Sequence, residues 1–249
     1  MKSALTGLAL IVSLTYLCPS ALQARAKKTE EIEPAVTSIS GTPEVPMSLG
    51  ESKTEIKMDL KTEIKEEQGG INKDGGIELP FRIYTEKGAK AYFTPSGWMG
   101  DFRDIRFNDA FKINPRSGKS CIQIKYTAER KNGAGWAGIY WQNPANNWGD
   151  KKGGYNLSKA KKLYFWARGM NGGEKIAEFK LGGINGTDFP GDSDSVSIGP
   201  IELTNRWRKY QIDLEGHDLS YIIGGFAFSA SADDNPEGFT IFLDDIYIE

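Results

Sequence analysis

The chain has 249 residues, 11% of them aromatic, and a formal net charge of −2. That length holds one domain with accessory segments. With this charge the chain has no overall positive potential to attract a polyanion. We therefore predict no nucleic-acid partner.

The first 26 residues have the order of a secretory signal peptide. Lys2 precedes the apolar run Ala4–Leu17, and an A-x-A cleavage site ends at Ala26, before Lys27. The apolar run is shorter than the roughly 20 residues that span a bilayer. We therefore predict a secreted or periplasmic protein with a signal peptide at 1–26 and no integral membrane segment after its removal.

The two cysteines leave one alternative and one constraint. A lipid anchor on Cys18 is less favoured, because Leu17 stands where a lipidation signal has a small residue. Cleavage after Ala26 leaves Cys121 alone, which excludes an intramolecular disulfide. Cys121 begins the alternating segment 121–126, so it is predicted to be a structural residue of a strand.

Residues 27–76 are rich in Glu, Lys, Ser, Thr and Pro and contain no aromatic residue. Such a segment buries too little apolar area to offset the entropy of ordering, so we predict a disordered charged linker. All tryptophans and phenylalanines follow residue 80. Because aromatic side chains dominate protein cores, the folded domain is placed at 77–249.

Short alternating runs bounded by Gly, Asn, Asp and Pro predict an all-β domain, a two-sheet β-sandwich of the jelly-roll type. The predicted strands are Phe81–Thr85, Asp104–Phe107, Ser120–Thr127, Gly135–Gln142, Lys162–Ala167, Ile176–Leu181, Ser195–Ile198, Arg206–Asp213, Tyr221–Ser229 and Thr240–Ile248.

Side chains alternate across a strand, so each run divides into an inward and an outward face. Several outward positions carry rings, amides and charges, and the loop between Trp141 and Gly149 adds amides and a second tryptophan, Trp148. Flat rings with hydrogen-bonding groups between them suit a sugar, which has apolar CH faces and hydroxyls. The alternative is that these rings pack beneath loops or fill a second small core. The predicted ligand-binding residues are Tyr140, Gln142, Asn143, Asn147, Tyr164, Trp166 and Arg168.

Four stretches, Gly97–Asp101, Gly135–Pro144, Lys162–Arg168 and Phe242–Tyr247, resemble a galactose-binding-like jelly roll over residues 78–249. That family includes non-catalytic carbohydrate-binding modules of secreted bacterial proteins. The resemblance implies a polysaccharide or other glycan as ligand.

Modules of this kind often carry an acidic residue in the last strand that ligates a structural Ca²⁺. Asp244 and Asp245 match that feature, so the resemblance implies a calcium site. An Arg, a Lys or a backbone partner is the alternative for a buried carboxylate at Asp244.

Catalytic motifs are missing from the sequence. The one histidine, His217, stands in a turn-like segment, and the adjacent Asp244 and Asp245 point to opposite sides, which does not suit glycoside hydrolysis. We predict a secreted, monomeric, non-catalytic carbohydrate-binding module. The alternatives are a cell-envelope structural or assembly module that binds a protein partner, and a weak glycan hydrolase or lyase.

Overall fold

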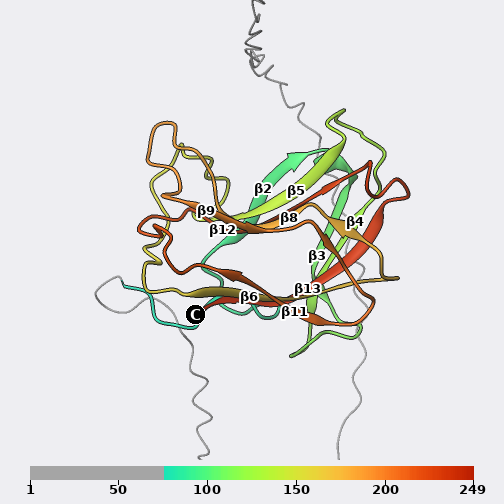
Figure 1. The fold of residues 1–249 in the computed structure, drawn as a ribbon, viewed down its shortest axis with the longest axis horizontal. Helices are drawn as coiled ribbons and strands as arrows, with labels where there is room; N and C mark the ends of the chain where they lie inside the picture. The colour runs from blue at the N-terminus through green and yellow to red at the C-terminus, as the bar shows by residue number, and fades with distance from the viewer. Residues whose placement is uncertain (1–75) are drawn as a thin grey trace, which may run out of the picture. The chain divides into compact units, whose positions relative to one another are not determined.

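The computed structural model describes residues 76–249, which form two facing antiparallel sheets (Figure 1). One sheet has the strand order β2-β5-β12-β8-β9. The other has the order β11-β6-β13-β4-β3, with β1 paired to β13, and β7 and β10 form a separate short pair. The strands are β1 Phe81–Tyr84, β2 Thr94–Gly100, β3 Ile105–Phe111, β4 Cys121–Tyr126, β5 Trp136–Gln142, β6 Lys162–Gly169, β7 Lys175–Ile176, β8 Glu178–Gly182, β9 Ser195–Ile198, β10 Ile201–Glu202, β11 Arg208–Asp213, β12 Gly224–Ser231 and β13 Phe239–Ile248.

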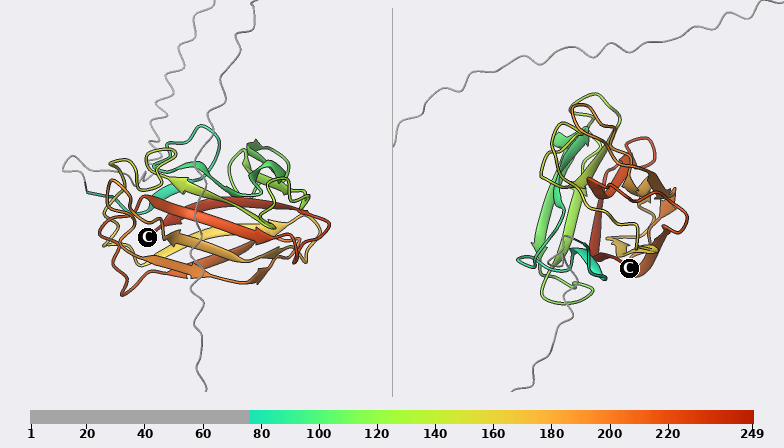
Figure 2. Two further views of the ribbon diagram at one scale, coloured as in Figure 1. Left: turned by 90° about the horizontal axis from the view of Figure 1, so that it is seen from above. Right: turned by 90° about the vertical axis from the view of Figure 1, so that its left-hand side faces the viewer.

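The core lies between the two sheets, where rings from one meet rings from the other. The Phe165 ring of β6 lies 4.5 Å from that of Phe179 in β8 and 5.3 Å from that of Phe226 in β12. All three side chains are fully buried. Figure 1 shows the two layers, and Figure 2 shows the strands of the domain from two further sides. The predicted all-β two-sheet sandwich is confirmed.

The predicted alternation is confirmed on the strands that matter most for function. Leu163, Phe165 and Ala167 of β6 are buried in the core, as are Ala137, Ile139 and Trp141 of β5. Cys121 is fully buried in β4, where a structural residue was expected.

The prediction for Ile176–Leu181 is wrong in one respect. The segment breaks into β7 and β8, and Ala177, expected in the core, is exposed while Ile176 is fully buried. The Ala177 N–H bonds to Ser229, whose strand otherwise pairs with β8 from Glu178 onward. Ala177 interrupts the alternation, so Ile176 points to the opposite side from the one that the alternation of β8 predicts.

Strand β2, Thr94–Gly100, was missed by the sequence analysis because Pro95 and two glycines look like a turn. The strand is at a sheet edge, where proline is tolerated. A Cβ on Gly97 would lie 2.7 Å from Cβ of Tyr140, so the glycine permits close approach to β5.

The predicted signal peptide and Cys18 lie outside the described residues, as does the linker up to residue 75. Within the part that the structure describes, no helix has the length and hydrophobicity to cross a membrane.

Candidate functional site

The structure divides the predicted ligand-binding residues between two surfaces. Tyr140 and Gln142 belong to β5, in the first sheet, whereas Tyr164 and Trp166 belong to β6, in the second. Because the inner faces of the sheets meet at the core, their outer faces point in opposite directions. A single site that combines the rings of β5 and β6 is therefore wrong.

Tyr140 is part of a second small core on the outer side of the first sheet. Its side chain is 5% exposed and packs with Ile184, Ile223 and Ala227. The phenol donates a hydrogen bond to the carbonyl oxygen of Gly182, and burial raises its pKa above the ordinary value. Tyr140 thus belongs to a second small core, the alternative that the sequence left open, and it has little exposed surface for a ligand.

The amides of Gln142 and Asn147 are used inside the protein. Both side chains are fully buried. Gln142 Nε2 donates to the Asn147 carbonyl oxygen, and its Oε1 accepts from Ser96. Asn147 Oδ1 accepts the N–H groups of Gly149 and Lys151, and its Nδ2 donates to two carbonyl oxygens. These residues shape the loop instead of presenting amides to sugar hydroxyls.

Asn143 has a similar structural position. Its Nδ2 donates to the Tyr92 carbonyl oxygen and the Tyr155 hydroxyl, and its Oδ1 accepts the N–H of Gly154. Every polar atom of this amide already has a partner. The three amides predicted to contact hydroxyls therefore serve the scaffold.

A groove of about 480 Å³ lies on the outer face of the first sheet. The outward residues of β12 in this lining, Ala227 and Ser229, are small. Larger side chains stand around this low floor, which makes the surface hollow. Besides the core residue Phe228, the aromatic, charged and polar residues of its lining are Trp136, Tyr140, Trp148, Glu178, Lys180, Asn185, Thr187 and Ser229.

Trp136 and Trp148 are the two exposed rings of this groove, with exposed fractions of 41% and 40%. The Trp148 ring meets Tyr140 edge to face, with centroids 6.0 Å apart. Neither tryptophan is among the ligand-binding residues predicted from the sequence. Its signals were nevertheless present, because Trp136 is outward on its strand and Trp148 stands in the amide-rich loop.

Trp136 is placed by a buried carboxylate. The Asp101 side chain accepts the N–H groups of Asn132, Ala134 and Gly135, which lead directly into β5. Burial opposes the ionised form, but these N–H groups outweigh it and hold the pKa of Asp101 below its ordinary value. The Asp101 N–H also donates to the Trp136 carbonyl oxygen.

The loop after β8 is tied to the loop that carries Trp148. The Gly149 carbonyl oxygen accepts from the N–H groups of Thr187, Asp188 and Phe189. Asp192 accepts the N–H groups of Ile184, Ile223 and Gly224, which fixes the far end of that loop to the start of β12. Both walls of the groove are thus held by backbone hydrogen bonds.

The groove carries one charge of each sign. Lys180 Nζ lies 2.9 Å from Glu178 Oε1, and both side chains are partly exposed on the outer face of β8. The pair leaves the groove without net charge while it still offers donors and an acceptor.

No protein-family model and no curated protein matches this chain. Among solved structures the chain is similar to carbohydrate-binding modules. A family 30 module is 17% identical with a TM-score of 0.48, covering 69% of this chain and 98% of that one. A family 30 module from a Clostridium thermocellum cellulosomal cellulase is also 17% identical with a TM-score of 0.48, covering 69% and 97%. A family 11 module from the same organism is 16% identical with a TM-score of 0.40, covering 67% and 92%.

The outer face of the second sheet carries the other predicted residues, and cations cover their rings. Cζ of Arg116 lies 4.1 Å from the centroid of Trp166, and Nζ of Lys209 lies 3.6 Å from that of Tyr164. Arg168, expected to face a ligand, is only 8% exposed and stacks on Phe242 at 3.8 Å. Burial lowers the pKa of Arg168. Cationic side chains lie over the rings of this face, whereas Trp136 and Trp148 of the groove are exposed.

The two acidic residues of the last strand lie at an irregularity in β13. Asp244 is fully buried, and its Oδ2 accepts the N–H groups of Arg116 and Ser117 at 2.8 and 3.3 Å. Its Oδ1 accepts the N–H of Asp245, which itself accepts from the Ser117 hydroxyl. Asp244 therefore has the backbone partner that was the alternative to calcium.

Calcium binds six to eight oxygen ligands. Among residues 76–249 no group of three or more His, Cys, Asp or Glu side chains is suited to a metal ion. Asp244 and Asp245 by themselves do not make up such a ligand set, and the calcium site stays a prediction.

Stability should depend on pH through Asp244. Burial, with the charge of Asp245, raises its pKa to about 6. Because folding raises this pKa from 3.8, the protonated carboxyl stabilises the fold fully below about pH 4. This contribution, about 3 kcal/mol, is lost as the pH rises through about 6. Urea unfolding of the full chain between pH 4.5 and 7.5 measures this slope. The same series on Asp244→Asn should be flatter, and an unchanged slope would contradict the assignment.

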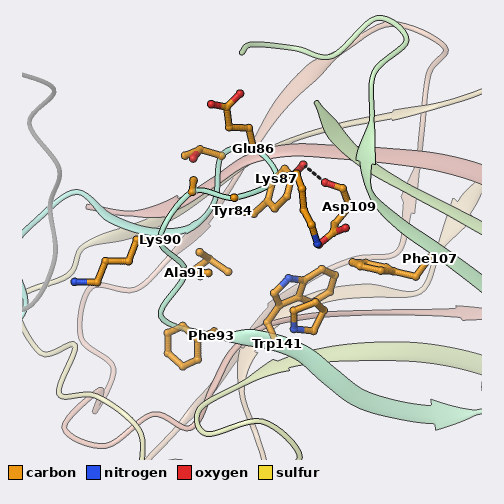
Figure 3. A pocket seen from close by; sticks show the side chains of 14 residues that line it. Tyr84, Glu86, Lys87, Lys90, Ala91, Phe93, Phe107, Asp109 and Trp141 are labelled. Atoms are coloured by element: carbon orange, nitrogen blue, oxygen red, sulfur yellow. Dashed lines mark hydrogen bonds and ion pairs between the residues drawn. The ribbon is translucent and has the colours of Figure 1, made fainter. Parts of the chain in front are cut away.

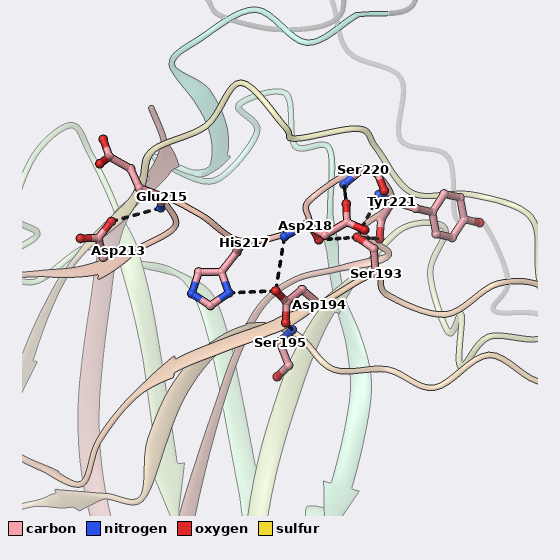
Figure 4. Close-up of polar contacts among 9 residues, drawn as sticks. All are labelled: Ser193, Asp194, Ser195, Asp213, Glu215, His217, Asp218, Ser220 and Tyr221. Carbon is pink, nitrogen blue, oxygen red and sulfur yellow. Dashed lines mark hydrogen bonds and ion pairs between the residues drawn. The ribbon is translucent and has the colours of Figure 1, made fainter.

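His217 takes part in hydrogen bonds that connect two loops, one at Ser193 and Asp194 and one at residues 217–221 (Figure 4). Its Nδ1 lies 2.8 Å from Asp194 Oδ2, which also accepts the Asp218 N–H. The Ser193 hydroxyl donates to the carbonyl oxygens of Asp218 and Tyr221. Nucleophilic catalysis needs a hydroxyl directed at a base, and here Ser193 is directed at backbone, so the cluster is structural.

A second cavity, of about 230 Å³, lies beneath the loop between β1 and β2 (Figure 3). Phe93 and Trp141 line it and are buried core rings, and Lys87 pairs with Asp109 beside it at 2.7 Å. The Tyr84 hydroxyl donates to the carbonyl oxygen of Asp109. The other rings of the lining, Tyr84 and Phe107, are partly buried and pack against the core, so none of the rings is an exposed platform for a sugar.

Proposed function

We propose that this protein is a secreted, non-catalytic carbohydrate-binding module that holds a neutral polysaccharide in the groove over β5, β8 and β12. The observation that carries the proposal is the pair of half-exposed indole rings, Trp136 and Trp148, on a groove with polar side chains between them. Ligand sites typically combine apolar or aromatic walls with a few placed polar groups.

The chemistry of the lining matches a sugar chain. An indole offers a flat apolar surface to the CH face of a pyranose ring. Glu178 accepts and Lys180 donates hydrogen bonds, while Asn185 and Thr187 do both. Because the charges of Glu178 and Lys180 balance, the groove favours a neutral glycan over a charged one.

Binding without turnover fits the single carboxylate among the described residues of the groove lining. Glycoside hydrolysis uses two carboxyl groups that flank the scissile bond. Among the described residues that line the groove, Glu178 is the one carboxylate, and it is paired with Lys180. The proposed secretion rests on the signal-like residues 1–26.

The test is affinity gel electrophoresis of the full chain in gels that contain neutral β-glucans, xylan, mannan or no polysaccharide. We expect retardation by at least one neutral polysaccharide, with no release of reducing sugar on long incubation. No retardation by any of them would contradict the proposal. Reducing sugar released by pure protein would instead support the hydrolase alternative.

A further inference from the structure

The outer face of the second sheet carries an unusual set of cations. One row of side chains crosses four neighbouring strands, from Arg82 on β1 through Tyr247 and Tyr164 to Gln211 on β11. Four adjacent strands span about 15 Å, the scale of a short oligosaccharide. Lys209 lies beside this row, with its Nζ 3.6 Å from the Tyr164 centroid and 5.5 Å from that of Tyr247.

Arg116 and Lys209 lie over two outward rings of β6, Trp166 and Tyr164. Lys209 is the register partner of Trp166, and the Arg116 guanidinium stacks on the Trp166 ring at 4.1 Å. In residues 76–249 neither cation takes part in an ion pair with an acidic side chain. A guanidinium stacked on a ring keeps its N–H edge free for a carboxylate, and the ring fixes it in advance.

The face as a whole has more cations than acids. Its acidic side chains are Asp213 and Asp245 on the strands, Glu249 at the end of β13, and the buried Asp244, which is the register partner of Trp166. Its exposed or partly exposed cations are Arg82, Arg106, Arg116, Lys125, Lys162 and Lys209. This excess contrasts with the balanced pair in the groove and with the net charge of −2 of the chain.

We propose that this outer face is a second binding surface, for an acidic polysaccharide, with Arg116 and Lys209 binding carboxylates of the polymer. The tyrosine hydroxyls and the Gln211 amide bind hydroxyls along the same chain. The two faces of the sandwich then hold two classes of glycan, and the protein links a neutral polymer to an acidic one. The second surface does not depend on the groove.

The test is binding of the purified full chain to polygalacturonate, measured by affinity electrophoresis and by titration at low and at 0.5 M salt. We expect Arg116→Ala with Lys209→Ala to weaken binding about tenfold, since exposed charge contacts are individually small. Salt should weaken binding of the parent protein more than that of the variant. Binding of neutral glycan should be unchanged in the variant.

The matched control is Arg103→Ala with Lys175→Ala, which removes two exposed cations at other places. It should bind polygalacturonate as the parent does. No binding by the parent, or equal weakening in both double variants, would overturn the proposal.

A lipid surface is the other occupant to test. Because Ile113 is 70% exposed in the same loop as Arg116, phosphatidylcholine vesicles with phosphatidylserine are tested too. Binding to these vesicles and not to polygalacturonate would also overturn it.

Discussion

Replacing both Trp136 and Trp148 by alanine is expected to weaken binding of neutral glycan by about 100-fold, and each single change by about tenfold. Each ring is about two-fifths exposed, so it supplies a stacking surface to the groove and little to the core. The free energy of unfolding should therefore change by less than about 1 kcal/mol. Titration calorimetry with the best polysaccharide from the panel, together with urea unfolding, measures both quantities.

Trp98→Ala is the matched control for these variants. Trp98 is 39% exposed, nearly the same as the groove rings, but it packs edge to face on Phe107 and is not part of the groove lining. Its loss should leave binding unchanged. Equal loss of affinity in Trp98→Ala, or full affinity in the groove double variant, would show that the ligand binds at another place. Trp166→Ala should also retain neutral-glycan binding.

The sequence was sufficient for the fold class and for the face of most side chains. Alternation in β5 and β6 separated core rings such as Trp141 and Phe165 from outward ones such as Trp166. These features are local, because the side-chain period of a strand follows from its own geometry. Where an irregular residue intervenes, as at Ala177, the period alone fails.

The composition of the site could not be read in the same way. Alternation shows that Tyr140 and Trp166 both point outward, but it does not show that β5 and β6 belong to different sheets. Strand pairing is a long-range property that depends on contacts between distant segments. The outward residues of the chain were therefore joined into one site when they belong to two surfaces.

The exposure of the amides was also beyond the sequence. Asn and Gln in a loop suit sugar hydroxyls and backbone groups equally well, since an amide donates and accepts in both cases. The partner is decided by how the loop folds back. In this protein the loop after β5 closes over Gln142 and Asn147, and both are fully buried.

Asn147→Ala is expected to destabilise the domain by about 3 kcal/mol and to weaken glycan binding indirectly. The buried amide makes hydrogen bonds with the backbone of Asn143, Gly149 and Lys151. Its removal leaves several of these buried groups without a partner, and each costs about 1–3 kcal/mol. The Trp148 ring then loses its fixed position, so affinity should fall although Asn147 itself does not reach the groove.

Asn185→Ala separates this structural role from direct contact. Asn185 is exposed and lines the groove, so its loss should reduce affinity severalfold while the urea midpoint stays unchanged. Asn147→Ala should instead lower the urea midpoint and change Trp148 fluorescence in the absence of glycan. If Asn147→Ala lost affinity at unchanged stability, the amide would be a ligand contact, as the sequence alone suggested. Whether affinity falls together with the urea midpoint or without it therefore decides whether the Asn147 amide supports the loop or contacts the sugar.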